Sequence, residues 1–179
     1  MGAVRPEESV MLMCGMIGTD RDILDRARDE LVGLYGPVDL ASEDFPFTQT
    51  DYYEAEMGSG LWRRLLAFRD LIVPGAIGAI KLKTQDMEEA YACRDAGNTR
   101  RRINLDPGYI APAKLVLATT KDFAHRVCLG EGIYAEVTLN FSKQGVRTFD
   151  WTYPDFKSEL YRPFLMEARR RLLKRVRVR

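Results

Sequence analysis

The sequence lacks most of the short motifs by which enzymes and nucleotide-binding proteins are recognised. Its 179 residues contain no G-x-x-x-x-G-K-[ST] phosphate loop and no G-x-G-x-x-G after a predicted strand. They also contain no G-x-S-x-G nucleophile elbow and no H-E-x-x-H zinc motif. Because His125 is the only histidine, sites built from several histidines are excluded. The sequence therefore carries no signal for zinc, haem or flavin.

Cysteine is scarce as well. Cys14, Cys93 and Cys128 lie far apart, and their odd number without C-x-x-C spacing argues against a disulfide framework or a zinc knuckle. Reduced, isolated thiols are typical of the cytoplasm. The first apolar run, residues 9–17, is too short to span a membrane and shows no signal-peptide pattern. We therefore expect a cytoplasmic protein without a membrane segment.

Length and composition are those of an ordinary folded domain. Apolar residues make up 46% and charged residues 30% of the chain, which is typical of a globular protein rather than a disordered one. A chain of this size can bury a substantial core without disulfides or metals. We expect one domain, residues 1–179, with a flexible N-terminal segment at residues 1–8.

Positive charge is concentrated at the C-terminal end. Residues 162–179 hold eight basic residues and one acid, a net charge of +7, and the remaining nineteen basic and twenty-five acidic residues give −6, which together make +1. Residues 36–62 hold six acids and no Lys or Arg. One hypothesis is that these two segments of opposite charge face each other.

The first predicted elements are a strand and a helix. Residues 10–17 form a continuous apolar run, which is typical of a strand buried on both faces. Thr19, followed by an acid at position 22, indicates a helix start. Apolar residues at helical spacing continue from there until Gly36-Pro37, where the helix is expected to end.

A hairpin and a second helix are predicted next. Segments 47–57 and 61–69 have the composition of strands, and Gly58-Ser59-Gly60 between them is typical of a hairpin turn. Pro74 is compatible with the first turn of a helix, where its missing N–H does no harm. The helical pattern then continues to about Cys93.

The second half of the chain is rich in predicted strands. Residues 102–106 alternate in polarity like a strand, and the following Asp-Pro-Gly-Tyr, residues 106–109, has the sequence of a type II turn. The apolar run at 113–118 is compatible with either helix or strand. Segments 126–129 and 133–141 flank a glycine-rich turn and are predicted to form a second hairpin, with the odd-numbered residues of 133–141 on its apolar face.

The last predicted helix begins near Ser158. It carries an apolar stripe at intervals of four residues: Leu160, Phe164, Ala168, Leu172 and Val176. The order of strand, helix, hairpin, helix, several strands and helix predicts an α+β fold with a mixed or mostly antiparallel sheet and flanking helices. The preferred topology is a ferredoxin-like core with an added hairpin and a basic C-terminal helix.

Two predicted strands place several polar side chains on one face. Arg102, Asn104 and Asp106 share a face of the first strand, and Tyr134 and Glu136 share a face of the second. Such faces could bind a ligand. The alternative is that they are solvated, because an antiparallel sheet normally has one polar face.

His125 is the candidate proton-transfer residue, because imidazole changes its charge near neutral pH. Its neighbours Lys121 and Arg126 would bind an anionic group, and a structural histidine at the start of a strand is the alternative. Asp106 and Glu136 together would suit Mg²⁺ carrying a phosphate. A cross-strand ion pair with Arg102 or Lys114 is an equally reasonable role for Glu136.

Residues 50–58, Thr-Asp-Tyr-Tyr-Glu-Ala-Glu-Met-Gly, are dense in acids and tyrosines. Metal ligation and base stacking are two roles compatible with this composition. The alternative is a polar hairpin whose negative charge offsets basic charge elsewhere in the chain.

The leading functional hypothesis is that the protein binds or transforms a phosphorylated or otherwise anionic small molecule, with a nucleotide as one candidate despite the missing phosphate loop. Whether it is an enzyme stays open. The predicted catalytic residues are His125, Glu136 and Asp106. The predicted ligand-binding residues are Arg102, Asn104, Lys114, Lys121, Arg126 and Tyr134, and no metal ligands are assigned.

Two other hypotheses rest on the basic C-terminal helix. Its phosphate-binding candidates are Arg169, Arg170, Arg171, Lys174 and Arg175. They could bind RNA, with an affinity that falls steeply as salt rises. They could instead dock on an acidic patch, either within this chain or on another subunit of an assembly. A solvated helix face is the third interpretation. The sequence does not indicate an oligomeric state.

Several segments together resemble a bacterial family. They are Phe45-Pro46-Phe47, Thr50-Asp51-Tyr52-Tyr53, residues 104–109 (NLDPGY), residues 114–118 (KLVLA), residues 132–139 (GIYAEVTL) and residues 151–155 (WTYPD). In this order they are similar to the family catalogued as domain of unknown function 4416, over about Val10 to Leu173. Some members are labelled GTP-binding protein, but this chain has neither a phosphate loop nor an [NT]-K-x-D motif. The resemblance implies a site among the polar strand faces and no particular ligand.

Overall fold

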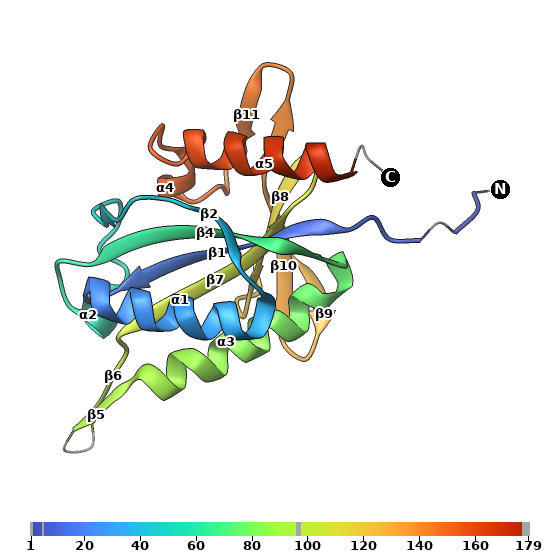
Figure 1. Ribbon diagram of the computed structural model, residues 1–179. Coiled ribbons are helices and arrows are strands. Elements are labelled where there is room, and N and C mark those ends of the chain that lie inside the picture. Colours follow the sequence, from blue (N-terminus) through green and yellow to red (C-terminus); the bar gives the residue numbers. More distant parts are fainter. Residues whose placement is uncertain (1, 5, 96–97, 177–179) are drawn as a thin grey trace.

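The structure is a computed structural model that describes residues 2–4, 6–95 and 98–176 (Figure 1). The main strands, in chain order, are β1 (Val10–Gly18), β2 (Val38–Ala41), β3 (Phe45–Pro46), β4 (Trp62–Ile72), β7 (Ile103–Ile110), β8 (Lys114–Thr119), β9 (Val127–Gly130), β10 (Ile133–Ser142) and β11 (Gly145–Thr148). The remaining elements are α1 (Arg21–Tyr35), α2 (Glu54–Met57), the 3₁₀ turn η1 (Pro74–Ala76), α3 (Ile77–Tyr91), β5 (Cys93–Asp95), β6 (Asn98–Arg100), α4 (Pro154–Lys157) and α5 (Arg162–Val176).

Within the described residues, nine strands form one antiparallel sheet in the order β11-β10-β8-β7-β1-β4-β2. β3 pairs with β4 and β9 pairs with β10, while β5 and β6 form a separate small hairpin. The predicted α+β class with a mostly antiparallel sheet is therefore confirmed. The chain passes through β1, α1, β2, β4, α3 and β7, and these four strands lie in the order β7-β1-β4-β2.

Helices cover both faces of the sheet. α1 and α3 lie on one face and α5 lies on the other, so that the sheet is the middle layer of three (Figure 1). β1 shows why this arrangement suits the sequence. All nine of its residues are buried, and alternate side chains enter opposite cores: Leu12 and Cys14 pack with α1 and α3, whereas Met11 and Met13 pack with α5. The predicted strand buried on both faces is confirmed.

The predicted hairpin of 47–57 with 61–69 is wrong. Only the second segment is a strand, within β4, and β4 already has β1 on one side and β2 and β3 on the other. β2 and β3 occupy the second edge of β4 at residues 66–68 and 62–63, and residues 47–57 instead end in the short helix α2. Gly58 has a φ of 83° and caps this helix rather than forming a hairpin turn.

The predicted type II turn at 106–109 is also wrong, because β7 runs straight through these residues. β1 pairs with β7 along its whole length, including Cys14 opposite Pro107, whereas β8 pairs only from Gly108 onward. Pro107 therefore lies where β7 has a single strand neighbour, and its missing N–H breaks no ladder. At Gly108 a Cβ atom would lie 2.3 Å from the Val116 carbonyl oxygen, so this close approach of two strands requires glycine.

The run at 113–118, which the sequence left open, is the strand β8. The second predicted hairpin is confirmed as β9 and β10, but its single apolar face is not. A bulge between Val137 and Leu139 shifts the alternation of β10. Ile133 consequently packs with α1 and α3, whereas Leu139 packs with α5, and Glu136 is buried with 2% of its surface exposed.

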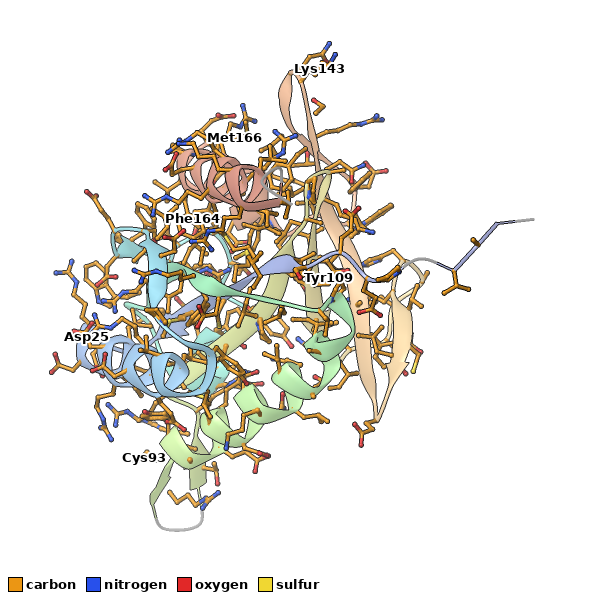
Figure 2. The ribbon with its side chains drawn as sticks, turned by 45° about the vertical axis from the view of Figure 1, so that its right-hand side comes forward. Asp25, Cys93, Tyr109, Lys143, Phe164 and Met166 are labelled. Carbon is orange, nitrogen blue, oxygen red and sulfur yellow. The ribbon has the colours of Figure 1, made fainter. Side chains whose placement is uncertain are left out.

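The helix termini differ slightly from prediction. The N-cap of α1 is Asp20 rather than Thr19, and its Oδ1 accepts a 2.8 Å hydrogen bond from the Ile23 N–H. α5 begins at Arg162, later than Ser158, so that its proline lies in the first turn. Of the predicted stripe on α5, Phe164 is buried on the side that faces the sheet (Figure 2).

Two expectations concern segments that lie partly outside the described part of the chain. Residues 1 and 5 of the expected flexible segment 1–8, and residues 177–179 of the basic segment, lie outside the described residues. Among residues 2–4, 6–95 and 98–176, no helix combines the length and apolar character needed to cross a membrane.

Candidate functional site

The sheet splits between β7 and β8. These strands pair only over Gly108–Ile110, so that the first half of β7 has β1 as its one strand neighbour among the described elements. α3 takes the place of the missing strand. The Lys81 ammonium donates a 2.7 Å hydrogen bond to the Leu105 carbonyl, and the Glu88 carboxylate accepts a 2.6 Å hydrogen bond from the Leu105 N–H. Both backbone groups of Leu105 are therefore satisfied without a strand.

A cavity of about 390 Å³ opens at this split, and we call it the β7–β8 cavity. Its volume lies within the range of small-molecule sites, about 300–1,000 Å³. The charged side chains on its wall are Lys81, Arg101, Lys121 and Arg126, which are positive, and Asp106, which is negative. Glu88 pairs with Lys81 and Arg101 from behind the wall, and Glu136 pairs with Arg126. The cationic groups on the wall are nevertheless the donors that an anion in the cavity would use.

Asp106 is the end of a chain of polar contacts. Its Oδ2 accepts hydrogen bonds from Asn104 Nδ2 at 2.8 Å and from Arg63 Nη1 at 3.3 Å. Asn104 in turn accepts a 2.6 Å bond from Arg101, which also pairs with Glu88. Within the described part of the chain, no donor contacts Asp106 Oδ1, and 29% of the side chain is exposed. This oxygen is therefore available to a ligand.

Arg63 holds Asp106 from the protein interior. Its side chain is 2% exposed, and its Nη2 lies 3.3 Å from an Asp155 oxygen, so that one guanidinium pairs with two carboxylates. Burial raises the pKa of Asp155, as does the charge of Asp106, while Arg63 opposes both. Gly15 on β1 leaves the space for Arg63, because a Cβ atom there would lie 2.7 Å from Nη2.

Arg126 is the most firmly held cation on the cavity wall. Its side chain is 3% exposed. Nε donates to Glu136 at 2.8 Å, Nη1 donates to the Lys121 carbonyl at 2.9 Å, and Nη2 donates to the Tyr153 hydroxyl at 2.7 Å. A guanidinium has five N–H groups, so two remain for a ligand in the cavity.

Two tyrosine hydroxyls on the wall are neutral donors. Burial raises the pKa of Tyr153, and the charges of Glu136 and Asp106 raise it further. Burial and Asp106 raise the pKa of Tyr53 in the same way. Both hydroxyls therefore keep their protons at neutral pH. Because the Tyr153 oxygen accepts from Arg126, its own hydrogen points elsewhere and is free for a ligand.

Aromatic rings border the cavity on its outer side. The Lys121 ammonium lies 4.1 Å from the centre of the Tyr52 ring and donates to its hydroxyl. Phe123 is 54% exposed and also lines the cavity. These rings offer flat apolar surface beside the cations.

Four of the residues predicted from sequence line this one cavity: Asn104, Asp106, Lys121 and Arg126. His125 and Glu136 lie just behind it. His125 Nε2 is 3.1 Å from a Glu136 oxygen, and the imidazole ring is stacked between Phe123 and Trp151 at centroid distances of 6.1 and 5.3 Å. Glu136 therefore contacts Arg126 and His125 rather than Arg102 or Lys114, the partners suggested by sequence.

Three predicted residues lie elsewhere. Arg102 pairs with Asp20 at 3.1 Å, at the N-terminus of α1. Lys114 is exposed at the opposite end of β8. Tyr134 lies beside Asp122, whose charge raises the pKa of its hydroxyl. These three residues therefore do not line the β7–β8 cavity: Arg102 precedes β7, Lys114 begins β8 at the end away from the split, and Tyr134 belongs to β10.

The predicted pair of carboxylates for Mg²⁺ is not arranged as a pair. Asp106 is bound by Arg63, and Glu136 is bound by Arg126, so that each carboxylate has its own guanidinium. Among residues 2–4, 6–95 and 98–176, no group of three or more His, Cys, Asp or Glu side chains is placed to hold a metal ion.

Sequence reasoning missed several residues of the site. The sequence did not single out Lys81 because a lysine in a helix is normally solvated, nor Arg101 because it lies just before the strand predicted at residues 102–106. Tyr53 belongs to the tyrosine-rich segment that the sequence did indicate. Tyr153 belongs to the WTYPD segment of the family resemblance, which was the only signal for it.

The basic helix α5 uses much of its charge within the chain. Arg171 and Arg175 pair with Asp39 of β2 at 3.4 and 3.1 Å. Arg169 donates a 2.8 Å hydrogen bond to the Pro112 carbonyl, and Arg170 pairs with Glu167. Asp39 belongs to the acidic segment 36–62, so the two segments of opposite charge do meet at this point.

The fold and the site together define an α+β protein with an antiparallel sheet that opens into a cation-lined cavity. A family model described as "domain of unknown function (DUF4416)" matches residues 8–172. The chain belongs to this family, as its motifs indicated. No curated protein and no solved structure shows a significant match to it.

Proposed function

We propose that the protein binds a phosphorylated or otherwise anionic small molecule in the β7–β8 cavity. The observation that carries this proposal is Arg126, a buried guanidinium fixed by three hydrogen bonds that retains two N–H groups on a cavity wall. A cation held in this way loses little freedom when an anion binds. Lys81, Arg101 and Lys121 add positive charge to the same wall.

The cavity also limits the shape and chemistry of the ligand. Tyr52, Tyr53 and Phe123 supply flat surfaces, so a ring on the ligand would find contact area beside the cations. Asp106 is the one carboxylate on the wall, and its free oxygen is the group best placed to accept a proton if the ligand is transformed. Neither His125 nor Glu136 is among the residues that line the cavity. Proton transfer by either of them stays a prediction.

Isothermal titration calorimetry with phosphate, pyrophosphate and adenosine 5′-monophosphate tests the proposal. We expect binding by the unaltered protein, and Lys121→Met should weaken it about tenfold, or roughly 1.4 kcal/mol. Lys114→Met is the matched control, because Lys114 is also an exposed lysine associated with β8 but lies away from the cavity. His125→Ala should leave the affinity within about twofold, since loss of a group that does not touch the ligand has a small effect.

Two results would contradict the proposal. One is the absence of binding by all three anions. The other is an equal loss of affinity in the Lys121→Met and Lys114→Met proteins, which would place the anions on the general surface charge rather than in the cavity.

We also infer that β1-α1-β2-β4-α3-β7 is a ferredoxin-like core. The βαββαβ order of these elements, the strand order β7-β1-β4-β2 and the location of α1 and α3 on one face support this inference. β8 to β11 and α5 would then be additions to the core. An experimental structure with β2 or β8 next to β1 would contradict it.

The other predicted properties rest on less. The contacts that Arg169, Arg171 and Arg175 make within the chain leave less support for the hypothesis that α5 binds RNA, although Lys174 is exposed. Docking of α5 on another subunit is weakened for the same reason. A cytoplasmic location is supported by the three free thiols, two of which are exposed.

A further inference from the structure

We propose that Asp106 makes the β7–β8 cavity selective for oxyanions that can carry a hydrogen of their own near neutral pH, such as inorganic phosphate or the monoanion of a phosphate monoester, over oxyanions such as sulfate that cannot. This inference rests on the proposed function and narrows its ligand class. It follows from the uneven set of charged groups on the cavity wall, where four cationic side chains face a single carboxylate.

The donors are sufficient to hold an anion. Arg126 retains two N–H groups and Tyr153 retains its hydroxyl hydrogen, and the exposed Lys121 lines the same cavity. Phosphate and sulfate are nearly the same size and could both use these donors. The donors alone therefore give little discrimination between the two ions.

Asp106 is the group that tells the two ions apart. Near neutral pH each phosphate ion carries at least one P–OH, whereas sulfate carries no hydrogen. The free Oδ1 of Asp106 can accept a hydrogen bond from phosphate, but against sulfate it places lone pairs and negative charge next to another acceptor. A site built around a ligand hydroxyl rejects an analogue that lacks it, because its own polar group is left unpaired.

Hydrogen bonds hold the Asp106 side chain in one orientation. Its Oδ2 is held by Asn104 and Arg63, whose exposed fractions are 4% and 1%. Arg63 is itself fixed by Asp155 at 3.3 Å. Because Oδ2 is anchored from the interior, Oδ1 stays directed to the cavity whichever ion is present.

The same anchoring predicts what Asp106→Asn would do. Arg63 and Asn104 both donate to the Oδ2 position, so the amide oxygen of the variant should occupy that position. The amide NH₂ group then replaces Oδ1 and faces the cavity. The variant thus offers a donor where the natural protein offers an acceptor, and its preference should move towards sulfate.

The test is calorimetric titration with sodium phosphate and with sodium sulfate, in chloride buffer of constant ionic strength near neutral pH. For the unaltered protein we expect phosphate to bind at least about tenfold more tightly, because an unpaired charged group costs more than one hydrogen bond gains. Asp106→Asn should lower this ratio at least about tenfold, through weaker phosphate and tighter sulfate binding. Asp122→Asn, an exposed change in the segment after β8, should leave the ratio unchanged.

The outcomes separate this inference from the proposed function. Equal binding of both ions by the unaltered protein would overturn the selectivity and leave the anion site intact, and this measurement needs no variant to fold. Selectivity that persists in a folded Asp106→Asn protein, as judged by its circular dichroism melt, would also overturn it. Failure of both ions to bind the unaltered protein would overturn the proposed function itself.

Discussion

At the scale of single residues, the interior of the site depends on one glycine. Gly15 lies on the central strand β1, and the guanidinium of Arg63 occupies the space where its side chain would be. Arg63 neutralises Asp106 and Asp155, and a buried cation with two carboxylate partners is costly to displace. The polar chain behind the cavity thus requires an empty space on the neighbouring strand.

Gly15→Ala should therefore destabilise the protein. The new Cβ would lie 2.7 Å from Arg63 Nη2, and relieving this overlap in a packed core costs about 1–3 kcal/mol. Urea denaturation measures the change. Gly33→Ala in α1 is the control, because no atom lies within 4 Å of its Cβ position and alanine should stabilise that helix by about 0.5–1 kcal/mol. Equal stabilities of the two variants would contradict the role of Gly15.

Asp44 gives a prediction for the pH dependence of stability. Its carboxylate accepts hydrogen bonds of 2.6 and 2.8 Å from Arg64, and these bonds hold its pKa below the ordinary 3.8. The pKa of Asp44 is therefore lower in the folded protein than in the unfolded chain. The contribution of Asp44 to the free energy of unfolding is complete above pH 3.8 and is lost as the pH falls through the folded-state pKa.

Asp44→Asn should consequently destabilise the protein by about 1–3 kcal/mol at pH 7. The difference from the unaltered protein should shrink as the pH falls below 3.8, because Asp44 then becomes protonated in both the folded and unfolded chain. Urea denaturation at several pH values measures this difference. Asp29→Asn, whose carboxylate is 70% exposed, should have a small effect at every pH. A difference that is independent of pH would contradict the assignment.

At the scale of secondary structure elements, strongly periodic or uniformly apolar segments could be predicted from the sequence, whereas the pairing of strands within the sheet could not. β1 and the β9–β10 hairpin follow directly from their apolar runs and glycine turn. Residues 47–57 were mistaken for a strand because their composition fits one, whereas the limited number of free edges on β4 is a property of the assembled sheet. The turn expected at 106–109 failed for the same reason, since pairing with β1 keeps Pro107 and Gly108 extended.

Side chains of α3 form hydrogen bonds with the backbone of β7 where β8 does not pair with it, and Glu88 accepts one of these bonds. Glu88→Leu should remove the acceptor of the Leu105 N–H and the buried partner of Lys81 and Arg101. Breaking one side of such a buried pair costs about 3–5 kcal/mol. Amide hydrogen exchange measures the effect. In the Glu88→Leu protein the exchange rate of the Leu105 amide should increase more, relative to the unaltered protein, than that of the Ile110 amide, because Ile110 pairs with Leu115.

The control for this change is Glu89→Leu, which alters an exposed glutamate of the same helix. It should leave the exchange rate of the Leu105 amide nearly unchanged. Comparable acceleration in both variants would mean that α3 protects the edge only by covering it, without the hydrogen bond from Leu105.

At the scale of the whole molecule, α5 is required for the fold rather than being a detachable basic tail. It covers one face of the sheet with Phe164, Leu165 and Leu172, all buried. Figure 2 labels Phe164 on α5 and Lys143 in the turn between β10 and β11, which are the last two strands at one edge of the sheet. Arg171 and Arg175 pair with β2 at the far end of the same layer. The core on this face has no other covering helix of comparable length within the described residues.

Truncation after Glu167 should therefore destabilise the whole protein, and not only remove positive charge. It deletes the buried Ala168 and Leu172, and loss of one large buried side chain already costs about 2–5 kcal/mol. Thermal melting followed by circular dichroism measures the effect. The double variant Arg170→Ala, Lys174→Ala removes two positive charges without touching the core and should keep nearly the same melting temperature. It is therefore the suitable variant for measuring RNA affinity. An unchanged melting temperature of the truncated chain would contradict this role of α5.

The sequence by itself determined the α+β class, the doubly buried central strand, the basic last helix and the family. It also indicated Asn104 and Asp106, because polar and apolar residues alternate along the predicted strand, and Lys121 and Arg126, because they are cations close to the only histidine. Only the tertiary structure decided that these four share a cavity with Lys81, Arg101 and Tyr153. That outcome depends on where β7 and β8 cease to pair, and on which helix covers the open edge. Such contacts join residues far apart in the chain, and their free energies depend on the whole packed sheet rather than on any local pattern.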